Sequence, residues 1–496
     1  MSTPYDFIVI GSGVSGMTAA ALLSKHGRKV ALVEKDAGLA PLISGFTRKG
    51  AYFDTGFHYA GGLAPGEILD RFLKCLGLAE HLTLAPYDPD GFELLRFPDL
   101  GCEFAFPYGR ERILKALATE FPREEAAVAR YLDEVDAIYA ALPYMDMSAE
   151  FSMDYLMASV HGESLAQALS RTTREPLLKA ILAAHTLFHA VSPERCSFFN
   201  HARAVGSFYR SVHGFAGGGL SLARAFAIQL NRLGVDLRLG QGAAEVLLTP
   251  AGSVAGVRLE KGDVIEGRGI IATVHPHALL RLVPETAFRP AFRKRLAGLD
   301  ETFSAYQLFV RAEALPRALK GRSLLVSPGL GSMEAMTPAE VRRKVMYVSA
   351  CHGTAGEAQG LVAVCPARRD ETAAWERSTP GARPKAYAQH KQEVMADMEE
   401  RLAAAIPELS GRMEVVAGAT PLTLRDLCHS PYGSLYGVQH VIGKYNPMPP
   451  TRVKGLFLAG QALTGPGLMG AMTSAFFACG TVLGHDALRG ELLRCS

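Results

Sequence analysis

The chain has no C-x-x-C pair among its eight cysteines, and neither sign of charge dominates it. Scattered cysteines of this kind do not indicate a zinc site or a dithiol redox centre, and they are typical of proteins from reducing compartments. The 52 Lys and Arg against 49 Asp and Glu leave a formal net charge of only +3, whereas nucleic-acid binding requires a concentrated basic stripe. We therefore expect no metal ligand set and no nucleic-acid partner.

No signal peptide is expected either, because an apolar strand already begins near Tyr5 and leaves no room for a charged segment and an apolar core before it. Residues 455–484 contain no charged residue and would be long enough to span a bilayer. The Gly465-Pro466-Gly467 turn interrupts this stretch, so we interpret it as a buried strand, a tight turn and a buried helix. The expected location is the cytoplasm, with peripheral contact with a membrane left open.

The clearest folding unit lies at the N-terminus. Phe7–Ile10 is a continuous apolar run, typical of a parallel strand that is covered on both faces. A helix is expected from Val14 to His26, where Gly27 stops it, and Lys29–Val33 reads as the second strand. Between the first strand and the helix stands Gly11-Ser12-Gly13-Val14-Ser15-Gly16, a G-x-G-x-x-G motif in the context that gives it meaning.

This motif predicts a dinucleotide-binding turn. The first glycine permits the turn, the second lets the backbone approach a pyrophosphate, and the third allows the helix to pack on the strand. The unpaired N–H groups of the helix start face the phosphates, and an acidic residue ends the next strand, 23 positions after Gly11, where ribose hydroxyls need a carboxylate. The expected contacts are Gly11, Gly13, Val14, Ser15, Gly16, Glu34 and Lys35.

Two further segments favour FAD over a nicotinamide dinucleotide. Phe53–Tyr59 includes an Asp-Thr-Gly turn, and residues 455–471 combine a short strand with a glycine-rich helix start. A flavin needs a second helix N-terminus, directed at the N1/O2 edge where charge accumulates in the reduced ring. The residues expected to contact the flavin here are Thr55, Gly56, Gly460, Gln461, Gly467, Leu468 and Met469.

The middle of the chain changes character. Residues 61–213 show helical periodicity, including Leu165–His189, and few strand signals, whereas residues 303–366 alternate like a sheet. The expected fold class is α/β: a discontinuous Rossmann-type FAD-binding domain, an α+β substrate domain and a mainly helical insertion. The expected division is 1–60, 214–280 and 441–496 for the FAD-binding domain, 61–213 for a helical insertion facing substrate or membrane, and 281–440 for the substrate domain.

These segments together resemble the phytoene desaturase, carotenoid isomerase and retinol saturase family, and most of all its retinol saturase branch. The resemblance rests on the G-x-G-x-x-G motif, on Phe53–Tyr59 and on residues 455–471, and more weakly on Gly217–Gly219 and residues 432–440. It implies FAD as cofactor, hydride exchange at flavin N5 with a polyene or isoprenoid substrate, and an adenine contact from the backbone of Val246. The stretch after the acidic residue departs from the family pattern, because Gly38 is its only glycine, and Ser44, Thr47 or Arg48 are candidate substitutes.

Individual residues leave alternatives open. His58 and Tyr59 follow the Asp-Thr-Gly turn and are candidate proton donors beside the flavin, while hydrogen-bonded support of the site is an equal alternative for the histidine. Asp54 is expected to fix the turn. His185 and His189 stand four apart, but without a third ligand they are interpreted as ordinary polar points on a helix. An aromatic cluster could line a substrate tunnel or fill a core: Phe198, Phe199, Phe208 and Tyr209.

Three functions remain compatible with these patterns. The first is a saturase-type, desaturase-type or isomerase-type enzyme acting on carbon–carbon double bonds of a hydrophobic substrate. The second is an amine oxidase-like small-molecule oxidase, with a smaller pocket walled by aromatic rings. The third is a non-catalytic prenyl-lipid escort protein, which the complete glycine motif disfavours. Eight residues could form a patch that dips into lipid, although the ordinary core of the insertion is the favoured interpretation: Met153, Tyr155, Leu156, Met157, Leu177, Leu178, Ile181 and Leu182. The electron partner is not predicted.

Overall fold

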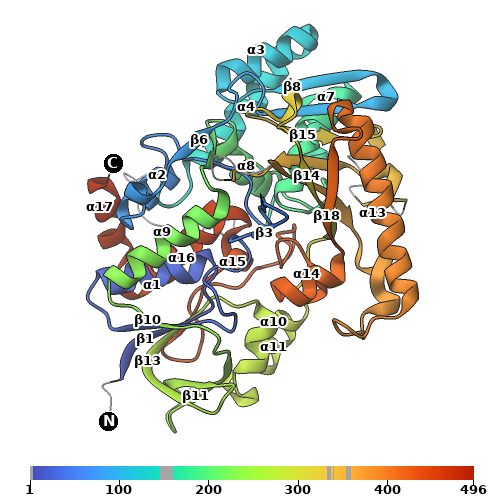
Figure 1. The fold of residues 1–496 in the computed structure, drawn as a ribbon. Coiled ribbons are helices and arrows are strands. Elements are labelled where there is room, and N and C mark those ends of the chain that lie inside the picture. The colour runs from blue at the N-terminus through green and yellow to red at the C-terminus, as the bar shows by residue number, and fades with distance from the viewer. Residues whose placement is uncertain (1–3, 146–159, 332–336, 339, 354–358, 496) are drawn as a thin grey trace.

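The computed structural model of the protein describes residues 4–145, 160–331, 337–338, 340–353 and 359–495, and its first sheet is assembled from three distant parts of the chain (Figure 1). The strand order is β10-β2-β1-β13-β12-β11, and β19 also pairs with β13. The strands are β1 (Tyr5–Ile10), β2 (Val30–Val33), β10 (Asp236–Arg238), β11 (Ala243–Leu248), β12 (Val254–Leu259), β13 (Val264–Ala272) and β19 (Leu456–Leu458). The pairs among β10, β2, β1, β13 and β19 are all parallel. This arrangement confirms the predicted discontinuous α/β fold.

Helices from the beginning, the middle and the end of the chain cover one face of this sheet. They are α1 (Val14–Lys25), α9 (Gly218–Arg232) and α16 (Gly467–Leu483). Met17, Phe226 and Phe476, one from each helix, are fully buried in the same apolar cluster. Phe476 also stacks on Phe72 of α2 (Ile68–Cys75), with ring centroids 4.2 Å apart. The packing places the start of α1 beside the start of α16.

A second seven-stranded sheet has the order β18-β14-β17-β16-β15-β7-β8. Its strands are β7 (Glu93–Phe97), β8 (Cys102–Phe106), β14 (Ser304–Ala312), β15 (Ser323–Val326), β16 (Met346–Ala350), β17 (Gln359–Ala367) and β18 (Met413–Ala419). Only the β7–β15 pair is parallel. Leu94 and Leu324 pack with α13 (Lys385–Ala405) on one face, whereas their neighbours Leu95 and Leu325 pack with the insertion helices on the other. Both faces are therefore covered.

The expectation of few strands between residues 61 and 213 was wrong for residues 84–106. β7 and β8 belong to the second sheet, and β6 (Leu84–Pro86) joins β5 (Ala60–Gly61) and β9 (Val212–Phe215) in a three-stranded sheet. Outside these strands, the described part of the insertion is mainly helical, as predicted. Its α-helices there are α2 (Ile68–Cys75), α3 (Arg110–Glu120), α4 (Glu125–Ala140), α6 (Leu165–Thr172), α7 (Pro176–Ala183) and α8 (Phe198–Phe208).

The predicted helical run from Leu165 to His189 is divided. α6 ends at Thr172, because the residue before a proline avoids helical backbone angles and Pro176 starts a new helix. The segment Ala184–Phe188 is a 3-10 turn. His185 and His189 therefore do not lie one turn apart on an α-helix, and the spacing argument for a metal pair does not apply.

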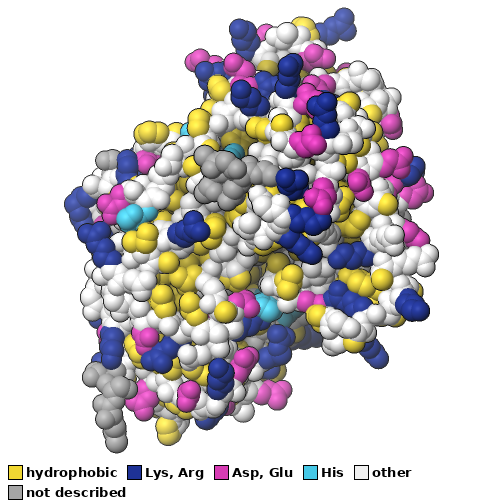
Figure 2. All heavy atoms as spheres, in the orientation of Figure 1, with side chains coloured by type: hydrophobic (Ala, Val, Ile, Leu, Met, Phe, Trp, Pro, Cys, Tyr) yellow, Lys and Arg dark blue, Asp and Glu magenta, His cyan; other side chains and the backbone are white. Residues whose placement is uncertain are grey.

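The uncharged stretch 455–484 forms β19, a short helix α15 (Gln461–Thr464) and α16, as predicted. Within the described ranges, no helix combines the length and hydropathy needed to cross a bilayer. Met153, Tyr155, Leu156 and Met157 lie outside the described residues, whereas Leu178, Ile181 and Leu182 are fully buried core of the insertion. On the face shown in Figure 2, basic and acidic side chains are interspersed.

Candidate active site

The turn between β1 and α1 has the geometry that its glycines predict. Gly11 has a φ of 101°, which a side chain would strain, and a Cβ on Gly16 would overlap the carbonyl oxygen of Gly11. A Cβ on Gly13 would meet no atom of the described chain within 4 Å. The turn is thus tightly packed beneath the helix and open in front of it, where a pyrophosphate is expected.

Glu34 organises this turn. Its Oε2 accepts hydrogen bonds from the backbone N–H (2.7 Å) and the hydroxyl (2.8 Å) of Ser12, and its Oε1 accepts from the N–H of Asp36 (3.0 Å). The Ser12 hydroxyl in turn accepts from the N–H of Ala40 at 3.1 Å. Ala40 has a φ of 49°, in the left-handed region that glycine usually occupies. Ser12 and Ala40 were missed by the sequence analysis, and they stabilise the loop that departs from the family pattern.

Two helix starts meet here. The hydroxyl of Ser15, in the first turn of α1, donates to the carbonyl of Ala471, in the first turn of α16, at 2.7 Å. A Cβ on Gly470 would overlap the carbonyl oxygen of Gly465, so α16 begins in close contact with the preceding turn. Within the described chain, neither N-cap, Gly13 or Pro466, makes a side-chain capping bond. Both sets of leading N–H groups are therefore available to a ligand, and this donor set fits FAD.

The remaining predicted cofactor residues have the following local surroundings. Thr55 donates its hydroxyl to the carbonyl of Leu42 (2.8 Å), and Gly56 packs against the same residue. Val246 is fully buried on β11. Lys35 directly follows the organising carboxylate, and partial burial lowers the pKa of its ammonium. The carbonyl of Gln461 accepts from His440 at 2.9 Å when that nitrogen is protonated. Their contacts with FAD stay predictions, as do those of Leu468 and Met469.

Asp54 joins two segments of the site. Its Oδ1 accepts from the N–H of Gly219, in the first turn of α9, and from the hydroxyl of Tyr52, both at 2.9 Å. The side chain is fully buried, and desolvation raises its pKa to about 6 despite these hydrogen bonds. Asp54 therefore stabilises the turn that presents His58 and Tyr59.

This raised pKa predicts a pH-dependent stability. Well below pH 4 the Asp54 carboxyl is protonated in both the folded and the unfolded chain. As the pH rises to about 6, ionisation is easier in the unfolded chain, so the folded state loses stability. Between pH 4, where the unfolded chain is already partly ionised, and pH 7, we expect wild type to lose about 2 kcal/mol of unfolding free energy relative to Asp54→Asn. Chemical denaturation of both proteins at pH 4 and 7 measures this, and a constant difference would contradict it.

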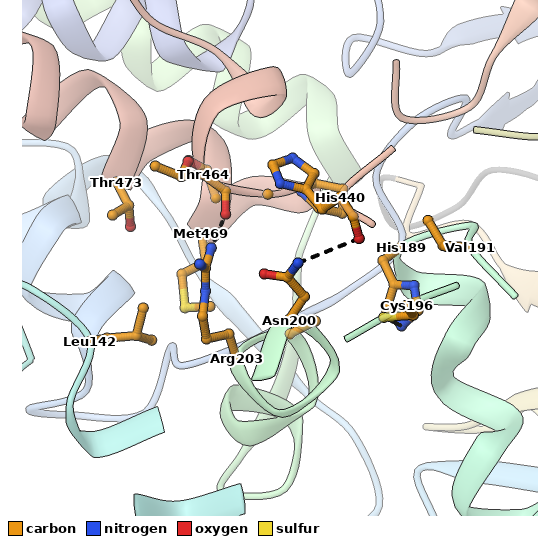
Figure 3. Close-up of a pocket in the computed structure, with 14 residues that line it drawn as sticks. Leu142, His189, Val191, Cys196, Asn200, Arg203, His440, Thr464, Met469 and Thr473 are labelled. Atoms are coloured by element: carbon orange, nitrogen blue, oxygen red, sulfur yellow. Dashed lines mark hydrogen bonds between the residues drawn. The ribbon is translucent and has the colours of Figure 1, made fainter. Parts of the chain in front are cut away.

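A pocket adjoins the start of α16 (Figure 3). Its cavity volume is about 50 Å³, and the pocket is partly open to solvent. Asn200 and Arg203 reach into it from α8, where Asn200 donates to the carbonyl of His440 (3.4 Å) and Arg203 to that of Thr464. Its apolar lining includes Leu142, Val191, Ala204, Pro466 and Met469. The pocket is therefore mainly apolar with a few polar groups, as is common for ligand sites.

His58 and Tyr59 lie in an aromatic region between the second sheet and the insertion. The Tyr59 ring has its centroid 5.0 Å from that of Tyr87, and further ring neighbours are Phe92, Phe188, Phe208 and Tyr347. Both side chains are partly exposed over their whole surface, but their titratable atoms are buried in the protein interior. Burial, with the nearby His352, lowers the pKa of His58 to about 4. Burial and the neighbouring Glu93 raise the pKa of the Tyr59 hydroxyl well above its usual value. The structure thus gives the two candidates opposite acid–base properties.

The histidines of the insertion contact different partners. His189 contacts His201 at 3.1 Å, while His185 lies 3.2 Å from a carboxylate oxygen of Glu93. Among the described residues, one other group brings ligand-type atoms within 4.8 Å of one another: His275, His277 and Glu301. In this group His275 Nδ1 accepts the N–H of His277 at 3.1 Å, so its Nε2, which faces the carboxylate at 3.0 Å, carries the hydrogen. A protonated nitrogen does not ligate a metal.

Two helix starts at a glycine turn, an organising acidic residue and an adjoining apolar pocket define a dinucleotide-dependent flavoenzyme. A family model for flavin-containing amine oxidoreductases matches residues 14–483. The chain belongs to this family, and it is an FAD-dependent oxidoreductase.

Individual relatives agree with the resemblance seen in the motifs. The rat (Rattus norvegicus) all-trans-retinol 13,14-reductase is 25% identical over 96% of this chain and 85% of its own length. The neurosporene-forming phytoene desaturase of Cereibacter sphaeroides is 25% identical over 56% of this chain and 54% of its own. The structure of putrescine oxidase bound to putrescine has a TM-score of 0.64 at 16% identity, with 99% of both chains covered. That last likeness concerns the fold alone.

Proposed function

We propose that the protein exchanges hydride and proton with a carbon–carbon double bond of a polyene or isoprenoid substrate. The observation that carries this proposal is the mainly apolar pocket beside the start of α16, where the flavin ring is expected. Relatives that act on retinol and phytoene support the same substrate class. An apolar substrate also supports a cytoplasmic enzyme with peripheral contact with a membrane.

FAD, when bound, supplies hydride exchange at N5. The residues proposed to hold its pyrophosphate and ribose are those of the β1–α1 turn with Glu34, while Val246 meets the adenine. The start of α16, including Leu468 and Met469, would hold the N1/O2 edge of the ring, where N–H groups would stabilise negative charge. The apolar pocket wall excludes water from the reacting carbons.

Tyr59 is the proposed proton donor to the second carbon. With a pKa of about 4, His58 is almost entirely the neutral imidazole at neutral pH, which is a very weak acid, and its Nδ1 makes no hydrogen bond within the described chain. The Tyr59 hydroxyl keeps its proton at all working pH values, because burial disfavours the phenolate. His58 is accordingly assigned to the support of the site.

Filling the pocket should impair the reaction with a long substrate. Ala204 lines the pocket from α8, and Ala204→Trp would fill part of the space with an indole ring. We expect kcat/KM for a polyene to fall at least about tenfold, a loss of roughly 1.4 kcal/mol of transition-state binding. Bound FAD, measured by its absorbance, should stay at the wild-type level. An unchanged kcat/KM would show that the substrate lies elsewhere.

The decisive experiment presents the FAD-loaded protein, in its reduced and oxidised forms and without oxygen, with retinol, phytoene and putrescine. The proposal is supported if either polyene changes the flavin spectrum and yields a product that differs by two hydrogens. It is also supported if an isomer of the polyene is released without a net change in the flavin. Flavin bleaching by the amine alone, with peroxide formed in air, would instead establish an amine oxidase. A protein that binds the lipid without flavin chemistry would be an escort.

A further inference from the structure

From the geometry around Tyr59 we infer that Glu93 is its proton partner, so that the two side chains form a relay inside the protein. This inference rests on the proposed function, because it concerns the proton that accompanies hydride transfer. It adds a residue that no sequence motif contains.

Glu93 opens β7 on the face of the second sheet that looks toward the insertion. Its Oε1 accepts from the hydroxyl of Tyr59 and from that of Ser323, both at 3.2 Å. Ser323 is its register partner on β15, so the sheet itself sets this contact. Oε2 lies 3.2 Å from His185 Nε2. Both oxygens of the carboxyl group are thus next to groups that can hold or donate a proton.

Beyond these three polar neighbours, the surroundings of the carboxyl group are apolar. Glu93 is 2% exposed, and His185 beside it is stacked between Phe92 and Phe188, with centroids 5.9 and 5.0 Å away. An ionisable group in such an apolar region costs several kcal/mol unless it is well paired. Buried ionisable groups of this kind are typical of functional sites, where they serve proton transfer.

The relay solves a problem that Tyr59 alone would have. When Tyr59 gives its proton to the substrate carbon, its O–H bond breaks and a C–H bond forms with the electron pair left by hydride addition to the neighbouring carbon. The phenolate would then be buried among aromatic rings, which its raised pKa disfavours. Transfer of the carboxyl proton of Glu93 restores the phenol and leaves a carboxylate beside Ser323 and His185. Hydride comes from reduced FAD, and solvent returns the proton between turnovers; desaturation reverses each step.

Glu93→Gln tests the relay, because glutamine keeps the size and the acceptor oxygen but exchanges no proton. With a polyene that the wild type converts, we expect product formation to fall at least about 100-fold, as for the loss of general acid–base catalysis. FAD content should be unchanged, and the solvent deuterium isotope effect should increase. The double variant Tyr59→Phe/Glu93→Gln should be no slower than Tyr59→Phe, since residues that act as a unit are not additive.

Two variants control for structural effects. Ser323→Ala removes the other hydroxyl from the same oxygen without removing the proton, and it should lower the rate less than about fivefold. Glu93→Asp keeps an exchangeable carboxyl, so it should recover part of the rate, and it replaces the glutamine variant if that one does not fold. Wild-type rate and isotope effect in Glu93→Gln, a Glu93→Asp variant no faster than Tyr59→Phe, or additive losses in the double variant would overturn the relay. Failure of wild type to convert any polyene would instead reject the proposed function.

Discussion

Gly16→Ala should yield a protein that no longer binds FAD and that unfolds more easily. The added methyl group would overlap the carbonyl oxygen of Gly11 and lie 3.0 Å from the Thr273 hydroxyl, so α1 would have to move away from β1. Forcing atoms into a packed interior typically costs 1–3 kcal/mol. The same movement would displace the leading N–H groups of α1 and the Ser15–Ala471 hydrogen bond that joins the two helix starts. Flavin absorbance after purification and the Tm of the apoprotein measure both effects.

Gly13→Ala separates cofactor binding from folding at the same turn. Gly13 has a φ of −60° and open space where its Cβ would point, so alanine fits the apoprotein without strain. We expect an unchanged apoprotein Tm but an FAD affinity lower by about 10- to 100-fold, because the methyl group occupies the space proposed for the pyrophosphate and weakens its hydrogen bonds. Gly490→Ala, in α17 (His485–Arg494), is the matched control and should change neither quantity. Equal FAD affinity in Gly13→Ala and wild type would place the pyrophosphate elsewhere.

Local sequence patterns predicted the parts of the fold that local forces determine. The strand, turn and helix around Gly11 and the strand and helix after Gly455 were placed to within a few residues, because glycine motifs and apolar runs define them. β7 and β8 were missed, because short apolar runs do not distinguish strand from buried helix, and the partner strand β15 lies more than 200 residues later. The break of the 165–189 run had a local signal in Pro176 that the helical periodicity concealed.

The residues of the site likewise fall into those that local motifs predict and those that only the tertiary fold reveals. Tyr59 could be found because it follows the Asp-Thr-Gly turn, and the cofactor residues because they belong to motifs. Glu93 and Arg203 stand in ordinary strand and helix sequence, and only the tertiary fold brings them to the aromatic region and the pocket. The position of Ser12 between two motif glycines indicated that it lies at the site. Its hydrogen bonds with Glu34 and Ala40 could not be predicted, because they depend on the path of the loop.

If Tyr59 rather than His58 is the proton donor, Tyr59→Phe should lower kcat far more than His58→Gln. At pH 7 a histidine with a pKa of about 4 is protonated in only about 0.1% of molecules. We expect Tyr59→Phe to lower kcat with a polyene by about 10²- to 10⁴-fold, the usual contribution of general acid–base catalysis, and His58→Gln to lower it less than about tenfold. Both variants should bind FAD, since neither side chain belongs to the proposed cradle.

The pH profile gives an independent measure of the same choice. With Tyr59 as donor the wild-type rate should not rise toward pH 4, because the phenol is protonated throughout, whereas catalysis by protonated His58 would increase steeply as the pH falls. Tyr306→Phe provides the matched loss of a buried hydroxyl, since Tyr306 contacts His390 at 3.0 Å on the α13 face of the second sheet, away from the site. It should keep the wild-type kcat. If His58→Gln were the more impaired variant and acid restored the rate of Tyr59→Phe, the proton would come from the histidine, and Glu93 would lose its partner.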